Sequence, residues 1–135
     1  MNIIVKTIPA GEQRYPTLGD WIFARRSESG QNLIQDDTAD TLHVFITDTG
    51  DDRANAALAI HEIAEATLCR EAGISQFDVD SFDMSFTGSG EPGDEPDAPY
   101  HDQHLVATAL EEFFIGRTSL GKKEYDELCL AAESG

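Results

Sequence analysis

The stretch that decides the fold is residues 41–72, TLHVFITDTGDDRANAALAIHEIAEATLCREA. Apolar and polar side chains alternate over Thr41–Thr47, and this period of two predicts a β-strand with one buried face. The acidic segment 48–52 then offers carboxylates that suit a helix N-terminus. The unbroken, alanine-rich segment 53–72 predicts a long helix that is closed by Gly73.

The residues before this stretch predict three further strands. Residues 3–8 are rich in β-branched side chains and stop at a Pro-Ala-Gly turn, which indicates a first strand. Two short apolar runs, 20–24 and 31–34, flank a polar segment that ends in Gly30 and are typical of a hairpin. We therefore expect a small antiparallel sheet of about four strands.

The residues after this stretch predict a long loop and two more helices. Segment 74–98 is rich in glycine, proline and acidic residues, and within it 82–86 alternates too briefly to indicate more than an isolated strand or an ordered loop. Helices are predicted from Pro99 to about Ile115 and over 122–132. The long loop lies between two helices, so we expect it to border a site and control access to it.

Together these elements indicate one α+β domain over residues 1–135, with three helices packed on one side of the sheet. The length suits one hydrophobic core, and the 40% hydrophobic and 26% charged fractions are those of a chain that folds.

The charge balance excludes several partners. Nine basic and 26 acidic residues give a net charge of −17, which repels phosphate backbones and anionic membranes. The sequence has neither an apolar run long enough for a membrane span nor a signal-peptide pattern at its start, so we expect a cytoplasmic protein. Cys69 and Cys129 match no zinc or redox spacing, and we expect two buried, reduced thiols.

The candidate catalytic and metal-binding residues lie in the predicted long helix, in the segment His61-Glu62-Ile63-Ala64-Glu65. His61 and Glu65 fall within roughly 40° of each other on a helical wheel, in the middle of an apolar stripe. Burying them without partners costs several kcal/mol, so a metal, hydrogen bonds or an opposite charge must compensate. Glu62 lies about 100° round the helix, where it can take a proton from a metal-bound water. Alternatively, His61 and Glu65 form only an i, i+4 pair on a partly exposed face.

A second set of candidate ligands lies on the helix predicted to start at Pro99. His104 and Glu111 share an edge of the broad apolar face that includes Val106, Leu110 and Phe113, whereas His101 lies about 60° closer to solvent.

The candidate metal ligands are therefore His61, Glu65 and His104, with His101 and Glu111 as alternatives. Two imidazoles and one carboxylate leave a position open for water, which favours catalytic zinc. Glu111 can complete the ligand set or hold His104 in place, and the sequence leaves both open.

A strand, a capped turn, a helix carrying His-Glu-x-x-Glu and a later helix with the third ligand resemble a minimal zincin metallopeptidase. The resemblance covers about residues 41–112 and implies a zinc-dependent hydrolase acting on a peptide, with Glu62 as the general base. It also implies that Thr41–Thr47 is the edge strand that lines the substrate cleft. The chain departs from the family because Glu65 occupies the place of the usual second histidine.

Residues 61–69 and 98–104 are also similar to small uncharacterised proteins of bacteriophages and prophages, which implies a phage or prophage source and the cytoplasm of an infected bacterium as location. Three other functions stay open. Glu62 and Glu65 can form an ExxE magnesium site of a nucleotide pyrophosphatase. His61 with His101 and Asp102 can form an HD-type phosphohydrolase site. An acidic protein without catalysis can bind a basic host protein by mimicking nucleic acid.

Overall fold

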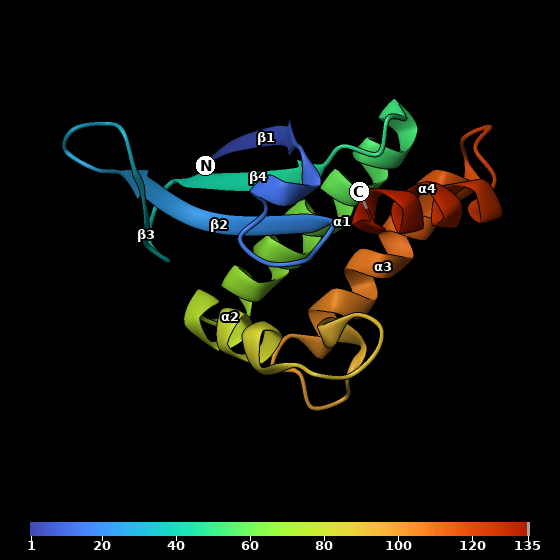
Figure 1. The fold of residues 1–135 in the computed structure, drawn as a ribbon. Coiled ribbons are helices and arrows are strands. Elements are labelled where there is room, and N and C mark those ends of the chain that lie inside the picture. The colour runs from blue at the N-terminus through green and yellow to red at the C-terminus, as the bar shows by residue number, and fades with distance from the viewer. Residues whose placement is uncertain (135) are drawn as a thin grey trace.

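The computed structural model describes residues 1–134 and shows an α+β fold with a four-stranded mixed sheet and four α-helices (Figure 1). The strands are β1 (Asn2–Ile8), β2 (Gly19–Arg26), β3 (Leu33–Gln35) and β4 (Thr41–Thr47). The helices are α1 (Asp52–Glu71), α2 (Gln76–Ser85), α3 (His101–Gly116) and α4 (Lys122–Ser134). Two short 3₁₀ turns lie at Ala10–Glu12 and Pro92–Asp94.

The sheet has the order β1-β4-β2-β3. The sequence predicts an antiparallel sheet, and this prediction is wrong because the sheet is mixed. β1 pairs with β4 in parallel, and β2 pairs antiparallel with both β4 and β3. The predicted hairpin is confirmed, and Gly30 in its turn has a φ of 75°, which favours glycine. A parallel pair needs a connection between distant segments, and local turn signals do not reveal it.

Strand β4 lies between β1 and β2, so the prediction that it is an edge strand is wrong. Both of its faces are covered, because Leu42 and Val44 are fully buried on one face and His43 is 6% exposed on the other. An interior strand cannot offer its backbone to a substrate, since both of its edges are already paired.

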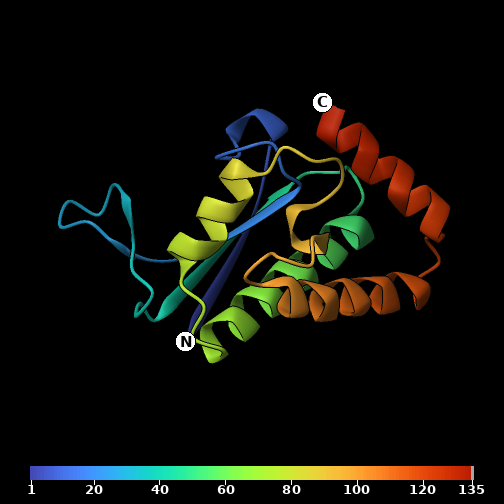
Figure 2. The ribbon, with the colours of Figure 1, turned by 90° about the horizontal axis from the view of Figure 1, so that it is seen from below.

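Helix α1 begins and ends close to the predicted residues. The Asp51 carboxylate accepts hydrogen bonds from the backbone N–H groups of Arg53 and Ala54, over 2.8 and 3.3 Å, and so caps the helix. At the other end Gly73 has a φ of 74°. The helix packs across one face of the sheet against β2 and β4, and α3 packs alongside α1 (Figure 2).

Helix α2 occupies part of the segment for which we expected a loop or an isolated strand. Ser75 caps it by accepting a hydrogen bond from the Asp78 backbone N–H over 3.1 Å. Val79 and Phe82 share one face of this helix and pack against the core. The alternation over 82–86 is therefore accidental, and the Ser-x-x-Asp cap was the signal for a helix.

Helix α3 packs against α1 and buries only some of its side chains. His104, Ala107 and Ile115 are buried, whereas Val106 and Phe113 are 48% and 71% exposed. The apolar face predicted for this helix therefore does not lie wholly in the core. A close approach of two helices favours small side chains between them, which explains why Ala107 is on the inner face.

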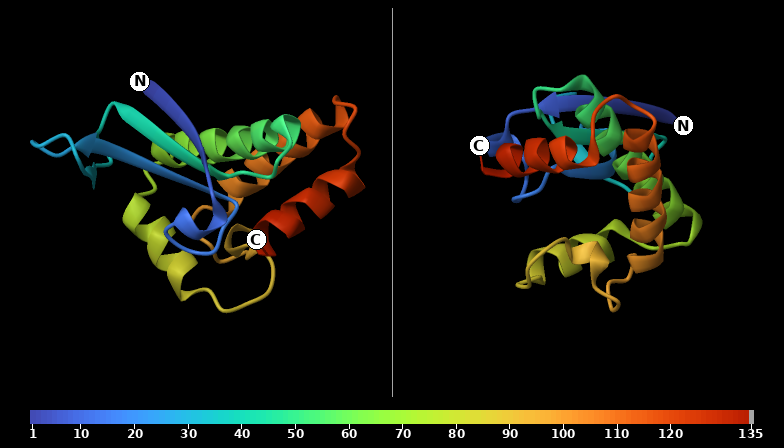
Figure 3. Two further views of the ribbon diagram at one scale, coloured as in Figure 1. Left: turned by 45° about the horizontal axis from the view of Figure 1, so that its top comes forward. Right: turned by 90° about the vertical axis from the view of Figure 1, so that its right-hand side faces the viewer.

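Seen from the right-hand side of Figure 1, α2 and the segment after it lie opposite the sheet, and α3 joins the two sides (Figure 3).

Cys69 is fully buried and Cys129 is partly buried, and both are free thiols. In residues 1–134, no helix combines the length and apolar character that crossing a membrane requires.

Candidate metal centre

Helix α1 places two polar side chains in the protein interior one turn apart. His61 is 8% exposed and Glu65 is 6% exposed. The His61 Nε2 atom lies 3.1 Å from Glu65 Oε2, so the two side chains converge as their i, i+4 spacing predicts. The interior is therefore polar at this point, and it needs compensating partners.

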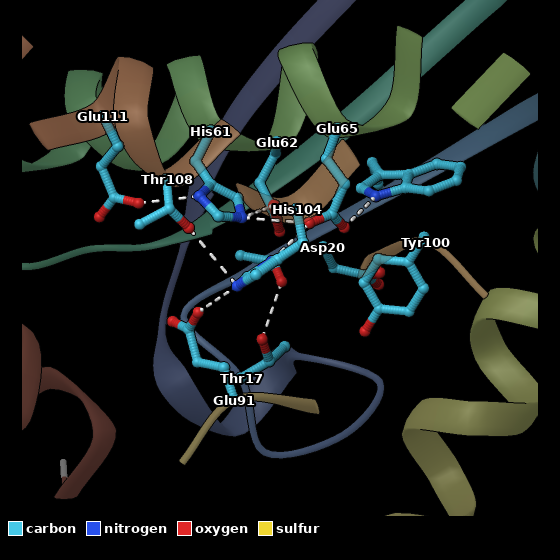
Figure 4. A network of polar contacts seen from close by, with 12 residues as sticks. Thr17, Asp20, His61, Glu62, Glu65, Glu91, Tyr100, His104, Thr108 and Glu111 are labelled. Carbon is cyan, nitrogen blue, oxygen red and sulfur yellow. Dashed lines mark hydrogen bonds and ion pairs between the residues drawn. The ribbon is translucent and has the colours of Figure 1, made fainter. Parts of the chain in front are cut away.

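Helix α3 adds the third side chain of the cluster. His104 is buried, and its Nδ1 atom lies 2.9 Å from the same Oε2 atom of Glu65 (Figure 4). The two imidazole rings meet edge to face with their centroids 4.8 Å apart. One carboxylate oxygen thus lies between two ring nitrogens from different helices.

The side chains of this cluster could hold a metal ion. The ligand atoms of His61, Glu65 and His104 all lie within 4.8 Å of one another. Tetrahedral zinc with bonds of about 2.0–2.1 Å sets its ligand atoms about 3.3 Å apart. The two nitrogen–oxygen distances, 3.1 and 2.9 Å, are within a few tenths of an ångström of that spacing.

The far nitrogen of each histidine has its own acceptor. His61 Nδ1 lies 2.8 Å from Glu111 Oε1, and the Tyr125 hydroxyl donates to the other oxygen of that carboxylate. His104 Nε2 lies 3.0 Å from Glu91 Oε2 and 3.1 Å from Asp94 Oδ1. An imidazole that donates from one nitrogen presents the other as a ligand, so these acceptors leave His61 Nε2 and His104 Nδ1 for the metal.

The Glu65 carboxylate also accepts a hydrogen bond at its other oxygen. The Trp21 indole N–H donates to Glu65 Oε1 over 3.0 Å, which leaves Oε2 directed at the histidines. Trp21 comes from β2, so the sheet and α1 together orient the carboxylate.

Without a metal, the cluster is a network of opposite charges. Burial favours neutral His61, but its contacts with Glu111 and Glu65 outweigh burial and raise the pKa of His61 to about 11. Burial likewise opposes ionisation of Glu65, but contacts with His104 and His61 prevail and lower the pKa of Glu65 to about 2. The pKa of His104 rises to about 10, against the effect of burial, because Glu65 and Glu91 lie beside it.

Glu62 lies next to this cluster and differs from its members. Its side chain is buried, and its carboxylate forms an ion pair with His61, whose Nε2 atom lies 3.9 Å from Glu62 Oε2. Burial raises the pKa of Glu62 well above its usual value, and the nearby Glu65 raises it further. A Cβ atom at position 19 would lie 2.6 Å from Glu62 Oε1, so the absence of a side chain at Gly19 makes room for the carboxylate.

The cluster lies on the wall of a cleft of about 470 Å³. Glu62, Glu65 and both histidines of the cluster line it. Other parts of its wall come from β2, from α2 and from the segment after α2. That segment places Gly93 against the His104 ring, where a Cβ atom would overlap the imidazole. Segment 74–98 therefore borders the site, as we expected.

The structure brings His61, Glu62, Glu65 and His104 together. Glu111 is also present, but it contacts His61 rather than its heptad partner His104. The remaining alternatives lie elsewhere. The His101 Nδ1 atom lies 2.9 Å from the Gly93 carbonyl oxygen, and Asp102 is exposed on the outer face of α3.

Sequence reasoning missed Trp21, Gly19, Glu91 and Tyr125 as parts of this site. Each comes from an element far from residues 61–65 in the chain, and no local spacing points to it. Comparisons of the chain with protein-family models, curated proteins and solved structures find no match. The geometry of the site is thus the basis for a functional conclusion.

Proposed function

We propose that this protein is a zinc-dependent hydrolase that cleaves an amide or peptide bond. The observation that carries the proposal is the convergence of His61, Glu65 and His104 within 4.8 Å, beside the carboxylate of Glu62. Three protein ligands and an open cleft are the composition of a catalytic zinc site. When bound, zinc acidifies a water and polarises a substrate carbonyl.

Glu62 is the group of this chain that moves protons. Its carboxylate borders the cleft without accepting a hydrogen bond from residues 1–134, so it is free to accept a proton from water. Once protonated, the same carboxyl can return the proton to the leaving amine.

The surrounding residues support a zinc site better than the other metal sites considered. An ExxE magnesium site needs oxygen ligands, but both histidines of the cluster engage Glu65. Phosphate substrates need cations, and no lysine or arginine lines the cleft within the described chain. Asp102 is exposed, which argues against an HD-type site with His61.

Metal analysis tests the proposal. We expect about one zinc ion per chain in protein purified without added metal, and its loss in His61→Ala and His104→Ala. His101→Ala is the matched control, because that imidazole contacts the Gly93 carbonyl and not the cluster. It should retain zinc. Circular dichroism confirms that each variant is folded.

Melting temperatures give a second measurement. Added zinc should raise the melting temperature of the wild type and of His101→Ala, but not of the two ligand variants, because only a folded chain with intact ligands binds the ion. Equal zinc content in all four proteins contradicts the proposal.

A further inference from the structure

Helix α3 exposes a stripe of apolar side chains on the side that faces away from α1. Leu105, Val106, Leu110 and Phe113 are between 45% and 71% exposed, and Ala109 is exposed among them. In Figure 2, α3 lies along one margin of the ribbon, and no other element lies on its outer side. We call these five residues the outer stripe. Large apolar side chains that gather on one exposed face mark an interaction surface, whereas single ones do not.

The spacing within the outer stripe is that of a helix that packs on another helix. Val106, Ala109 and Phe113 are three and four residues apart, and they fall within roughly 60° of each other on a helical wheel. Leu105 and Leu110 flank this line on its two sides. Ala109 lies in the middle of the line, where a small side chain permits two helix axes to approach closely. The outer stripe therefore favours a helix as its partner.

The charged residues at the two ends of α3 have opposite signs. Asp102 lies in the first turn, in line with the outer stripe, and Arg117 follows the last helical residue. Both side chains are exposed, and within residues 1–134 neither forms an ion pair. Glu112 is about 100° round the helix from Phe113 and so lies at the margin of the stripe. The stripe thus ends in an acidic group on one side and a basic group on the other.

These positions are symmetric along the helix. The pairs Val106/Phe113 and Asp102/Arg117 have the same midpoint, near the middle of α3. When a second α3 packs antiparallel about a two-fold axis at this midpoint, Val106 faces the partner's Phe113, and Asp102 faces the partner's Arg117. The two-fold axis makes each of these contacts twice. A second copy of this chain therefore complements the outer stripe in its apolar pattern and in its charges.

We propose that the protein forms a two-fold symmetric dimer in which the outer stripes of two α3 helices pack antiparallel. The net charge of −17 on each chain repels a second copy over most of the surface. The outer stripe with Asp102 and Arg117 has no net charge, so two copies can meet on it. Standard interfaces use about 20–30 residues a side, more than one helix face provides, so we expect a dissociation constant in the micromolar range.

Analytical ultracentrifugation tests the dimer independently of zinc and of catalysis. We expect a reversible equilibrium between monomer and dimer over concentrations of about 1–500 μM. Phe113→Glu places a carboxylate opposite the partner's Val106 and should weaken dimerisation at least tenfold. Phe77→Glu is the matched control, because Phe77 on α2 is also 71% exposed and lies outside the outer stripe. It should leave dimerisation unchanged. Circular dichroism confirms that both variants are folded.

Charge reversal tests the antiparallel register. Asp102→Arg and Arg117→Asp each place like charges opposite each other at both ends of the helix pair, and each should weaken dimerisation about fivefold. The double variant restores opposite charges and should return the dissociation constant to within threefold of the wild-type value. Asp102→Arg is the decisive variant because it makes the chain less negative, so general repulsion alone would strengthen its dimer.

Four results overturn the inference. The first is a wild-type chain that stays monomeric over the whole concentration range. The second is a dimer that Phe77→Glu weakens as much as Phe113→Glu, since another surface then forms it. The third is stronger dimerisation of Asp102→Arg, which contradicts the register. The fourth is a monomer that floats with neutral phosphatidylcholine vesicles and no longer does so as Phe113→Glu, which assigns the outer stripe to a membrane.

Discussion

The Trp21 indole of β2 donates a hydrogen bond to Glu65 Oε1 on α1 over 3.0 Å, while Glu65 Oε2 lies between the two histidines. This contact joins the sheet to the candidate metal centre and fixes which carboxylate oxygen faces the two histidines. Residues that orient a ligand in this way typically contribute a factor of about 10–100 in metal affinity.

We therefore expect Trp21→Phe to weaken zinc binding by about 10- to 100-fold while the protein stays folded. Zinc affinity is measured by competition with a chromogenic chelator. Phe23→Leu is the control, because Phe23 is equally buried in β2 and packs on Trp21 but has no hydrogen bond to Glu65. Equal zinc affinity of Trp21→Phe and wild type contradicts the positioning role of the indole.

Substitutions at two glycines distinguish the proposed role of Glu62 in catalysis from that of His104 in metal binding. Alanine at Gly19 places a Cβ atom 2.6 Å from Glu62 Oε1, so this variant should lose most hydrolytic activity and retain zinc. Alanine at Gly93 overlaps the His104 ring, so this variant should lose zinc as well. Neither glycine has a positive φ, and the effects therefore come from contact and not from backbone strain.

Gly11→Ala is the control for both glycine variants, because no atom lies within 4 Å of a Cβ at that position. The three variants are compared by zinc content and by hydrolysis of the best peptide substrate. The assignment of Glu62 and His104 to different tasks is wrong if Gly19→Ala and Gly93→Ala lose zinc equally.

Asp83 should make the stability of the fold depend on pH. Burial raises its pKa from the ordinary 3.8 to about 6; the Tyr100 hydrogen bond opposes this rise, and the nearby charges of Glu65 and Asp80 add to it. Because the pKa is raised in the folded state, the protonated carboxyl stabilises the fold below about pH 4. This stabilisation is lost as the pH rises through 6.

Asp83→Asn removes this titration and keeps the acceptor for the tyrosine hydroxyl groups. Two pKa units correspond to about 2.7 kcal/mol, and partial access to solvent reduces the expected effect to on the order of 1–2 kcal/mol. The unfolding free energies of variant and wild type should therefore agree near pH 4, and the variant should be more stable at pH 7. Urea unfolding at both pH values measures this, with Asp78→Asn as the control; a constant difference between the two proteins contradicts it.

Local patterns explain which parts of this fold could be predicted. The alternation over Thr41–Thr47 and the Asp51 cap lie within the elements that they specify, so β4 and α1 were placed correctly. The parallel pairing of β1 with β4 joins segments about 40 residues apart. No local sequence pattern in either segment indicates this pairing. The sequence analysis did not predict helix α2, because it considered the alternation over 82–86 and not the helix cap at Ser75.

Local sequence patterns likewise predict some residues of the candidate site and not others. The spacing of His61 and Glu65 places both on one helix face, and helical periodicity also selected His104 over His101. The partner of Glu111 was not predictable, because the heptad relation to His104 considers one helix alone, whereas the contact with His61 depends on how α3 crosses α1. Gly19 and Trp21 require knowledge of the sheet order, which the sequence does not show.

The general-base role of Glu62 gives the sharpest test of catalysis. Glu62→Gln keeps the size of the side chain and removes its basicity, and the residue is not among the expected metal ligands. Zinc content should therefore stay at the wild-type value, while turnover falls by two or more orders of magnitude. Glu71→Gln, an exposed change on the same helix, should leave turnover unchanged. Activity is measured on the best substrate from a screen of peptides and amides with zinc, manganese or cobalt. Full activity of Glu62→Gln, or no hydrolysis by the wild type with any of these ions, contradicts the hydrolase proposal. In that case the net charge of −17 favours binding of a basic protein instead, measured as binding that weakens as salt concentration rises.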